Sequence, residues 1–403
     1  MGPERLRTAR LEVDRDGSGD ELRGDGAGEA EDGAVGGRLG WTAMAEKRDG
    51  DTMHVEVPVP TPKKYGVLLK VEAACLHPSD WKIQEGMLRP ILPTKFPYIP
   101  ALDVAGEVVE VGFGVKKFKS GDKVVAFLGA FGSSLGEAVS LEAFNIIRVT
   151  FALFDMVNQC CLSLVLSVPW IESQSGGGLA EFVVAEENMT VPRPPEVSAA
   201  EGAGLPGSSL TALHALTQLA GVKLDGSGPR KNLLITAASG GVGHFAVQLA
   251  MLGNTHVTAT CGARNLDFVK GLGADEVLDY KTPDGAALKS PSGQKYDAVI
   301  HCAVGIPFSV FEPNLSPNGK VIDLTPNCGS LMTFAVKKLT FSKKQLVPLI
   351  AVRRAESLDY LVQLVKEGKL RTVIDSRHPL TKAEEAWARI IDGHATGKII
   401  VVP

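Results

Sequence analysis

One stretch of the chain, from Leu233 to Ala250, constrains the fold more than any other. It reads LLITAASGGVGHFAVQLA, an apolar strand that runs into a turn of small residues and then into an amphipathic helix. Small residues let the backbone approach a pyrophosphate, and the helix N-terminus offers free N–H groups and the positive end of its dipole. The pattern predicts a dinucleotide site whose contacts come from Ala238, Ser239, Gly240, Gly241, Val242 and Gly243.

From Lys231 onward, short apolar strands alternate with helices. Such alternation is typical of a parallel sheet that helices cover on both faces, and right-handed crossovers make the sheet doubly wound. We therefore predict a Rossmann domain over residues 205–344. Its expected strands are 233–236, 257–260, 298–301 and 320–324, and its expected helices are 242–252 and 266–272.

The chain before this domain is rich in β-branched residues bounded by glycines. Strands are expected at Val67–Leu76, Val104–Val111 and Lys123–Phe127, in a small bent antiparallel sheet. Beyond residue 344, helices at 357–367 and 382–391 and strands at 372–374 and 398–402 are expected to rejoin it. The fold class is therefore α/β, with a β-rich domain (residues 53–204 and 345–403) interrupted by the Rossmann domain.

Composition excludes several classes of protein. A net charge of -4 and the lack of a long Lys/Arg run argue against nucleic acid as a partner. The six cysteines form no CxxC pair, and no apolar stretch reaches the roughly 20 residues of a membrane span. Residues 1–52, rich in Gly, Asp, Glu and Arg, are expected to be a disordered extension, too acidic for a transit peptide.

The second strand of the Rossmann unit indicates which nucleotide is preferred. NAD-binding units usually carry an acidic residue there to bind the ribose 2′-hydroxyl, but this window reads Thr260-Cys261-Gly262-Ala263-Arg264. With no carboxylate to repel a 2′-phosphate and Arg264 to pair with it, we predict NADPH, with Cys261 and Arg264 at the site. In the alternative interpretation, Arg264 merely begins a solvated helix.

The glycine turn, together with LKVEAACLHPSDWKIQEGMLRP (69–90), IPALDVAGEVVEVG (99–112) and GHATGKIIV (393–401), resembles the quinone oxidoreductase branch of the zinc-independent medium-chain dehydrogenase/reductase superfamily. The match is close to the plant chloroplast-envelope members. The resemblance implies a GroES-like catalytic domain wrapped around the Rossmann domain, with NADPH and substrate between them. It further implies reduction of α,β-unsaturated carbonyls (enones, lipid-derived ketones) or quinones, a homodimer, and a chloroplast location peripheral to the envelope membrane; a cytoplasmic location is the alternative.

The zinc-dependent branch of the superfamily is a rival that the residues can test. Its catalytic metal needs a Cys, a Gly-His-Glu histidine and another Cys. At the first two places this chain has His77, then Leu102 before Asp103, and no third ligand can be identified. We therefore predict no metal site, and expect His77 to hydrogen-bond at a turn and Asp80 and Asp103 to be structural.

The resemblance also assigns roles to residues outside the glycine turn. Lys82 is the catalytic candidate, as a hydrogen-bond donor to the enolate oxygen or to the cofactor ribose; a solvated surface lysine is the plain alternative. Thr211 is expected to face the nicotinamide, Tyr280 the adenosine, and Cys302 and Ala303 the ribose and nicotinamide. Cys302 receives a binding role only, because a cysteine that ends an apolar strand is usually a packing residue.

Several departures from the family pattern bear on activity. The segment 129–175 interrupts a connection that is short in relatives, and we interpret it as an imperfect gene model or a splice form; if genuine, it lies beside the substrate cleft and could contact a membrane. His77 stands where the family usually has Asn, and Ser208 and Ser209 are more polar than expected. The alternative function is therefore an NADPH-binding structural or interaction protein with little or no turnover.

Overall fold

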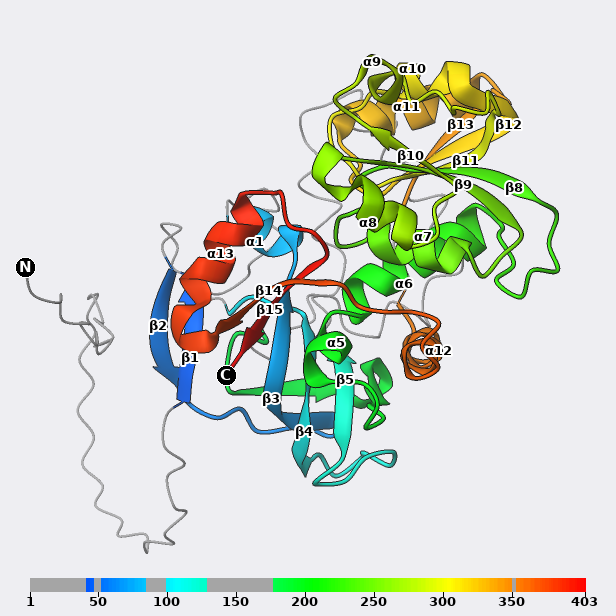
Figure 1. Ribbon diagram of the computed structural model, residues 1–403. Coiled ribbons are helices and arrows are strands. Elements are labelled where there is room, and N and C mark those ends of the chain that lie inside the picture. The colour runs from blue at the N-terminus through cyan, green and yellow to red at the C-terminus, as the bar shows by residue number, and fades with distance from the viewer. Residues whose placement is uncertain (1–40, 47–51, 85–98, 129–176, 350–352) are drawn as a thin grey trace, which may run out of the picture.

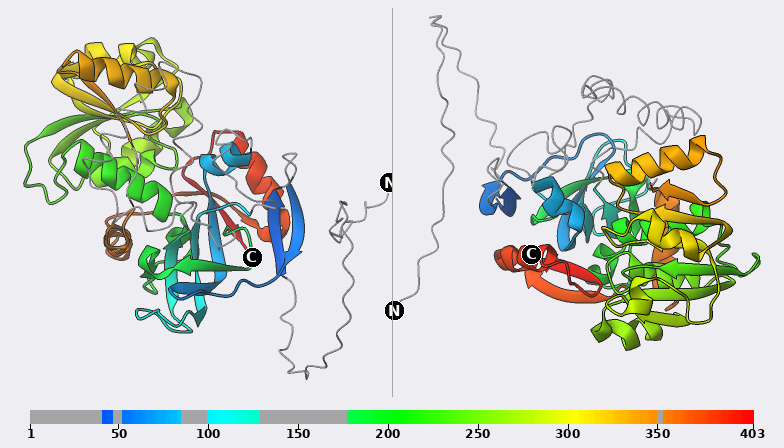
Figure 2. Two further views of the ribbon diagram at one scale, coloured as in Figure 1. Left: turned by 180° about the vertical axis from the view of Figure 1, so that it is seen from behind. Right: turned by 90° about the horizontal axis from the view of Figure 1, so that it is seen from above.

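The computed structural model describes residues 41–46, 52–84, 99–128, 177–349 and 353–403. They form two large sheets, one six-stranded and one seven-stranded, and a separate two-stranded hairpin. Figure 1 and Figure 2 show the two large sheets as distinct bodies, each with its own helices. The predicted disorder of residues 1–40 and the predicted insertion at 129–175 lie outside the described residues.

The six-stranded sheet is parallel throughout and has the order β10-β9-β8-β11-β12-β13. The strand order reverses between β8 and β11, and in doubly wound sheets ligands bind where the carboxyl ends of such strands part. The predicted Rossmann fold is confirmed. Its strands are β8 (Lys231–Ile235), β9 (Thr255–Cys261), β10 (Glu276–Asp279), β11 (Tyr296–His301), β12 (Leu315–Asp323) and β13 (Gln345–Pro348).

Alternation along β8 explains why helices cover both faces of this sheet. Leu233 and Ile235 belong to a buried cluster with Phe245 on one face, whereas Leu234 belongs to a different cluster with Phe311 on the other. Successive side chains of a strand point to opposite faces, so an apolar strand of this kind needs cover on each side. The helices are α6 (Pro206–His214), a π-helix (Ala215–Leu219), α7 (Gly243–Ala250), a 3-10 turn (Ala263–Asn265), α8 (Leu266–Gly271), α9 (Pro283–Ala286), α10 (Phe308–Phe311), a 3-10 turn (Glu312–Asn314) and α11 (Cys328–Leu339).

The seven-stranded sheet has the order β14-β15-β3-β4-β5-β7, with β6 paired to β3. Strand β3 is its long central member: its first half pairs with β6 and its second half with β15. The close approach of β4 depends on Gly106, where a Cβ would lie 2.3 Å from the Lys70 carbonyl oxygen. The strands are β3 (Gly66–Leu76), β4 (Asp103–Val111), β5 (Lys123–Phe127), β6 (Phe182–Glu186), β7 (Thr190–Pro192), β14 (Ile374–Pro379) and β15 (Lys398–Val402).

The C-terminal segment returns to this second sheet, where β15 lies between β14 and β3 and α13 packs beside it (Figure 1). Helix α12 contacts both α6 and β7, and therefore joins the two bodies. None of the helices in the described ranges is long and apolar enough to cross a lipid bilayer. The remaining elements are α1 (Pro78–Gln84), a 3-10 turn (Glu187–Met189), α5 (Ala199–Ala203), α12 (Ala355–Lys366), a 3-10 turn (Leu380–Lys382) and α13 (Ala383–Ile391).

Three observed strands differ from the expected domain boundaries. Strands β1 (Trp41–Glu46) and β2 (Thr52–Val57) form an antiparallel hairpin, so residues 41–46 are not part of a disordered extension. This hairpin contains aromatic and β-branched residues, which are rare in the preceding chain and which favour strands. Strand β13 is an edge strand of the six-stranded sheet, so the chain leaves that sheet after Pro348 and not at residue 344. The other domain boundaries remain predictions.

Candidate functional site

The glycine turn after β8 is held by its own backbone. Ala237 adopts a left-handed conformation (φ 48°), and its carbonyl oxygen accepts from the Gly240 N–H at 2.9 Å. The Ala238 N–H donates to the Thr260 carbonyl oxygen of β9 at 2.8 Å. At Gly243 a Cβ would lie 2.3 Å from the Ala237 oxygen, so only glycine fits there. The turn therefore presents small residues and the N-terminus of α7, which suits a dinucleotide pyrophosphate.

His244, the residue after this turn, is fully buried and links the turn to the second body. The Gly240 carbonyl oxygen lies 2.8 Å from its Nδ1, so Nδ1 is the donor, and Nε2 accepts from the Val373 N–H at 3.3 Å. Burial lowers the pKa of His244 to about 3. The imidazole is therefore neutral, and it ties the glycine turn to the residue that precedes β14.

Cys302 and Ala303 lie next to the glycine turn, where β11 ends beside β8. Both N–H groups donate to Thr236 Oγ1, at 3.0 and 3.2 Å. Burial raises the pKa of the Cys302 thiol to about 12, so the thiol stays protonated. The structure thus places the backbone of these two residues at the switch point, in keeping with a binding role and no chemical one.

Cys261, Arg264 and Tyr280 come together at the ends of β9 and β10. The Cys261 carbonyl oxygen accepts from the Tyr280 N–H at 3.1 Å, and the Tyr280 side chain is 46% exposed. Arg264 is exposed on the turn between β9 and α8, and its Nη2 donates to the His394 carbonyl oxygen. These residues rim one end of the turn where the ribose of a dinucleotide would lie.

Thr211 and Lys82 come from elements other than those that carry the residues described so far. Thr211 is on α6, partly buried, and its Oγ1 donates to the Gly207 carbonyl oxygen at 2.6 Å. Lys82 is in the last turn of α1 and partly buried. Asp80, two residues earlier and therefore on another side of the helix, points inward and accepts from the N–H groups of His77 (2.7 Å) and Ala101 (3.3 Å). Asp80 has the structural role predicted for it.

A buried polar cluster joins the two bodies beside Thr211. Asp103 Oδ2 accepts from the Gly207 N–H at 2.8 Å and lies 2.5 Å from His77 Nε2, while Lys398 Nζ donates to Ser208 Oγ at 2.7 Å. Lys398 Nζ also lies 3.4 Å from His77 Nε2. Although burial by itself would raise it, the pKa of Asp103 is lowered by His77, Lys398 and the Gly207 N–H. Asp103 is therefore ionised and balances the neighbouring ammonium.

Two buried polar atoms near this cluster, Asp103 Oδ1 and Arg353 Nε, have no hydrogen-bond partner among the residues that the structure describes. The Arg353 guanidinium stacks over Phe127 at the end of β5, 4.2 Å from the ring centroid. Burial lowers the pKa of Arg353, and the Asp103 charge opposes that effect. In the described ranges, no group of three or more His, Cys, Asp or Glu side chains could hold a metal ion.

Sequence reasoning missed this cluster as a unit, although its members carried signals. His77 and Ser208 stood out as departures from the family pattern, and Lys398 lies in the GHATGKIIV motif. His77 does hydrogen-bond at a turn, through its backbone, but its side chain bonds Asp103. Asp103 accepts from a helix N–H and lies against an imidazole; the sequence does not reveal these contacts, because residues 77, 103, 208 and 398 meet only in the folded chain.

Two protein-family models match parts of the chain. Residues 63–195 match the alcohol dehydrogenase GroES-like domain, and residues 272–401 match the zinc-binding dehydrogenase family. The solved quinone oxidoreductase of Coxiella burnetii superposes with a TM-score of 0.68 at 29% identity, covering 90% of this chain and 99% of that one. The chain therefore shares its architecture with a known oxidoreductase.

Two proteins of similar sequence indicate which kinds of oxidoreductase the chain resembles. A chloroplast envelope quinone oxidoreductase homologue of Arabidopsis thaliana is 63% identical over 350 residues, which span 87% of this chain and 93% of that protein. A chloroplastic NADPH-dependent alkenal/one oxidoreductase of the same plant is 29% identical over 351 residues, spanning 86% of this chain and 74% of that protein.

Proposed function

The chain belongs to the quinone oxidoreductase branch of the medium-chain dehydrogenase/reductase superfamily, and from this premise we propose that it reduces α,β-unsaturated carbonyls, or quinones, with NADPH and without zinc. The observation that carries the proposal is the glycine turn, whose backbone and helix N-terminus adjoin the ends of β9 and β11. The Arabidopsis relatives named for quinone and alkenal/one reduction support the substrate class.

The choice of NADPH depends on Arg264. Replacing Arg264 with Ala is expected to weaken NADPH binding by ~10–100-fold, which corresponds to the loss of one or two charge-assisted hydrogen bonds to a 2′-phosphate. NADH lacks that phosphate, so its affinity should change less than twofold. Titration of intrinsic fluorescence with both nucleotides measures this directly, and an equal loss for both would remove the assignment.

Two features support a reaction without zinc. The His77 imidazole, at the place of the first metal ligand in the zinc-dependent branch, is already engaged by the Asp103 carboxylate and lies 3.4 Å from the Lys398 ammonium. A divalent cation at this imidazole would meet the repulsion of that ammonium. When bound, NADPH supplies the hydride; the protein must position the substrate and stabilise the negative charge that develops on its carbonyl oxygen.

Two cations are candidates for that stabilisation, Lys82 on α1 and Arg353 beside Phe127 and Asp103. We favour Lys82, and expect Lys82→Ala to lower kcat by ~100-fold with NADPH affinity unchanged, as for loss of one oxyanion donor. Arg353→Ala, prepared in parallel, is the matched comparison. Full kcat in the Lys82 variant and a large loss in the Arg353 variant would transfer the role to the guanidinium; full kcat in both would exclude the two.

The decisive experiment is NADPH oxidation by the full chain and by a chain lacking residues 129–175, with a panel of enones, ketols and quinones. We expect substrate-dependent oxidation with at least one enone or quinone. NADPH binding without any substrate-dependent oxidation would favour the alternative of a structural or interaction protein. Zinc in stoichiometric amount by elemental analysis would contradict the metal-free mechanism.

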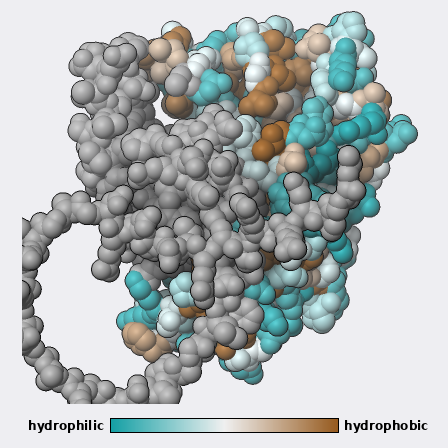
Figure 3. Space-filling view, turned by 90° about the vertical axis from the view of Figure 1, so that its left-hand side faces the viewer, coloured by the Kyte–Doolittle hydropathy of each residue, from teal (hydrophilic) through white to brown (hydrophobic). Residues whose placement is uncertain are grey.

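We further propose a chloroplast location at the envelope, as the name of the Arabidopsis relative states for that protein. Helix α11 exposes an apolar stripe of Leu331, Met332, Val336 and Leu339, which suits contact with an acyl boundary. Apolar surface gathers over the upper, six-stranded part of the face in Figure 3. Co-flotation with anionic vesicles tests the proposal, and a homodimer by light scattering, with no flotation, would assign α11 to self-association instead.

A further inference from the structure

The loop between α13 and β15, residues 392–397, contacts two separate parts of the proposed nucleotide site. The Gly397 N–H donates to the Ser239 carbonyl oxygen in the glycine turn at 2.9 Å. On the other side, the His394 carbonyl oxygen accepts from Arg264, and Thr396 Oγ1 lies 3.2 Å from Asn265 Nδ2. We call residues 392–397 the bridging loop. It comes from the C-terminal segment, but it touches the turns that follow β8 and β9.

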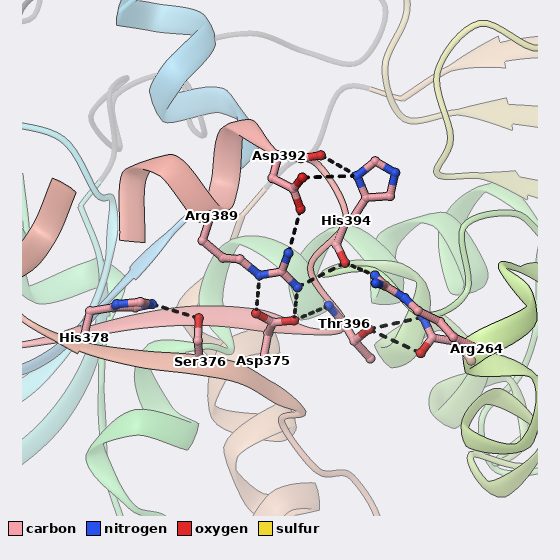
Figure 4. A network of polar contacts seen from close by, with 9 residues as sticks. Arg264, Asp375, Ser376, His378, Arg389, Asp392, His394 and Thr396 are labelled. Atoms are coloured by element: carbon pink, nitrogen blue, oxygen red, sulfur yellow. Dashed lines mark hydrogen bonds and ion pairs between the residues drawn. The ribbon is translucent and has the colours of Figure 1, made fainter. Parts of the chain in front are cut away.

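An ion pair in the catalytic domain holds this loop in place (Figure 4). Arg389 of α13 donates to both carboxylate oxygens of Asp375 on β14, each at 2.8 Å, through Nε and Nη2. The Asp375 carboxylate is only 9% exposed, and its Oδ1 also accepts from the Thr396 N–H at 2.7 Å. Bidentate pairs of this kind fix direction as well as distance. The far side of the loop is therefore firmly oriented.

One carbonyl oxygen, that of His394, is shared by two guanidinium groups. Arg389 Nη2 donates to it at 3.3 Å, and Arg264 Nη2 donates to it from the opposite side (Figure 4). Arg389 is neutralised by Asp375 and by Asp392, whose Oδ2 accepts from Nη1 at 2.7 Å. The contact of Arg264, by contrast, is with a neutral acceptor and uses one of five N–H donors. The carbonyl thus aims Arg264 without cancelling its charge.

We propose that Arg389 is a specificity-determining positioning residue, which fixes the His394 carbonyl and thereby holds the Arg264 guanidinium ready for a 2′-phosphate. Holding a long side chain in its bound orientation removes part of the entropy cost of binding. Preference for the phosphorylated nucleotide is then set partly from the catalytic domain, by a residue that does not touch the cofactor. The inference rests on the proposed use of NADPH.

A merely structural role for the Arg389–Asp375 pair has a different signature. If the pair only holds the C-terminal segment against β14, its loss should reduce the stability of the fold and lower the affinities for NADPH and NADH together. If the pair positions Arg264, its loss should lower the affinity for NADPH alone. The ratio of the two affinities therefore separates the two roles, and kcat at saturating NADPH should not change.

The test is Arg389→Lys in the full chain, which keeps the charge and removes the two-pronged geometry. We expect the dissociation constant for NADPH to rise by ~5–10-fold and that for NADH to stay within twofold. Asp375→Asn is a second variant that should shift the ratio in the same direction. Arg377→Lys, the same change at an exposed residue of β14, is the matched control and should leave both constants unaltered.

Three outcomes are distinguishable. A selective loss for NADPH in the Arg389 and Asp375 variants supports the proposal. An unchanged ratio, or equal losses, in variants that keep their circular dichroism spectrum and melting temperature overturns it while leaving the NADPH assignment intact. Equal affinity of the unaltered chain for NADPH and NADH overturns that assignment, and this inference with it.

Discussion

Replacing Gly243 with valine is expected to abolish useful nucleotide binding, lowering NADPH affinity by at least ~100-fold, or ~3 kcal/mol. The reason is steric: any Cβ at this position would lie 2.3 Å from the Ala237 oxygen and 2.7 Å from the Ala238 Cα. Both are backbone atoms of the turn, so they cannot rotate away as a side chain would. Fluorescence titration with NADPH measures the loss, and a melting curve reports the accompanying strain.

Gly241→Ala is the control for this prediction. Its Cβ would lie 3.6 Å from the nearest atoms, which belong to Gly397, Lys398 and Ser208, an ordinary packing distance. The variant should therefore melt like the unaltered chain. If this variant lost NADPH binding, the added methyl group would be in collision with the nucleotide itself, because the turn would be undistorted. Retention of NADPH binding by the Gly243 variant would mean that the turn does not hold the cofactor.

Acidification is expected to destabilise the protein steeply through His244. Its pKa is lowered to about 3 in the fold, against about 6.5 in an unfolded chain. Below pH 6.5 the imidazole is protonated in the unfolded chain but stays neutral in the folded chain. The free energy of unfolding that is present above that pH is therefore progressively lost. The expected slope is ~1.4 kcal/mol per pH unit, continuing down to about pH 3.

Urea unfolding at pH 7.5, 6 and 5 measures this slope, with His244→Asn as the comparison. The asparagine amide can still donate to the Gly240 carbonyl oxygen but does not titrate, so its free energy of unfolding should depend less on pH. The buried His301, whose pKa is also lowered by burial, is common to both proteins and cancels in the difference. Equal slopes in the two proteins would show that His244 is not the responsible group.

Much of the fold could be predicted because its signals are local. The strand, small-residue turn and helix from Leu233 onward follow one another in the chain, and β3, β4, β5 and β15 are apolar runs near their expected positions. Short strands were missed: β10 has four residues and β7 three, too few for any periodicity to show. Strand β13 was not predicted either, because its four residues are too few to show an alternation of apolar and polar side chains.

The residues of the candidate site also divide into those that the sequence predicts and those that it does not. Residues of the glycine turn, and Cys302 and Ala303 after β11, lie where strand order alone would put them. The cluster of His77, Asp103, Ser208 and Lys398 could not be foreseen, since its members come from four distant segments. Lysine is rarely buried unless paired, and Lys398 is 3% exposed. Only the folded chain reveals which groups compensate its charge.

The position of β15 has a consequence for how the molecule is made. This strand, residues Lys398–Val402, pairs with β3, the central strand of a sheet whose other half is synthesised early. Because β14 joins this sheet through β15, the edge of β3 that pairs with β15 stays unpaired until both strands have been synthesised, and it is open to other nascent chains until then. The nucleotide-binding sheet, by contrast, is continuous from β8 to β13 and can close sooner.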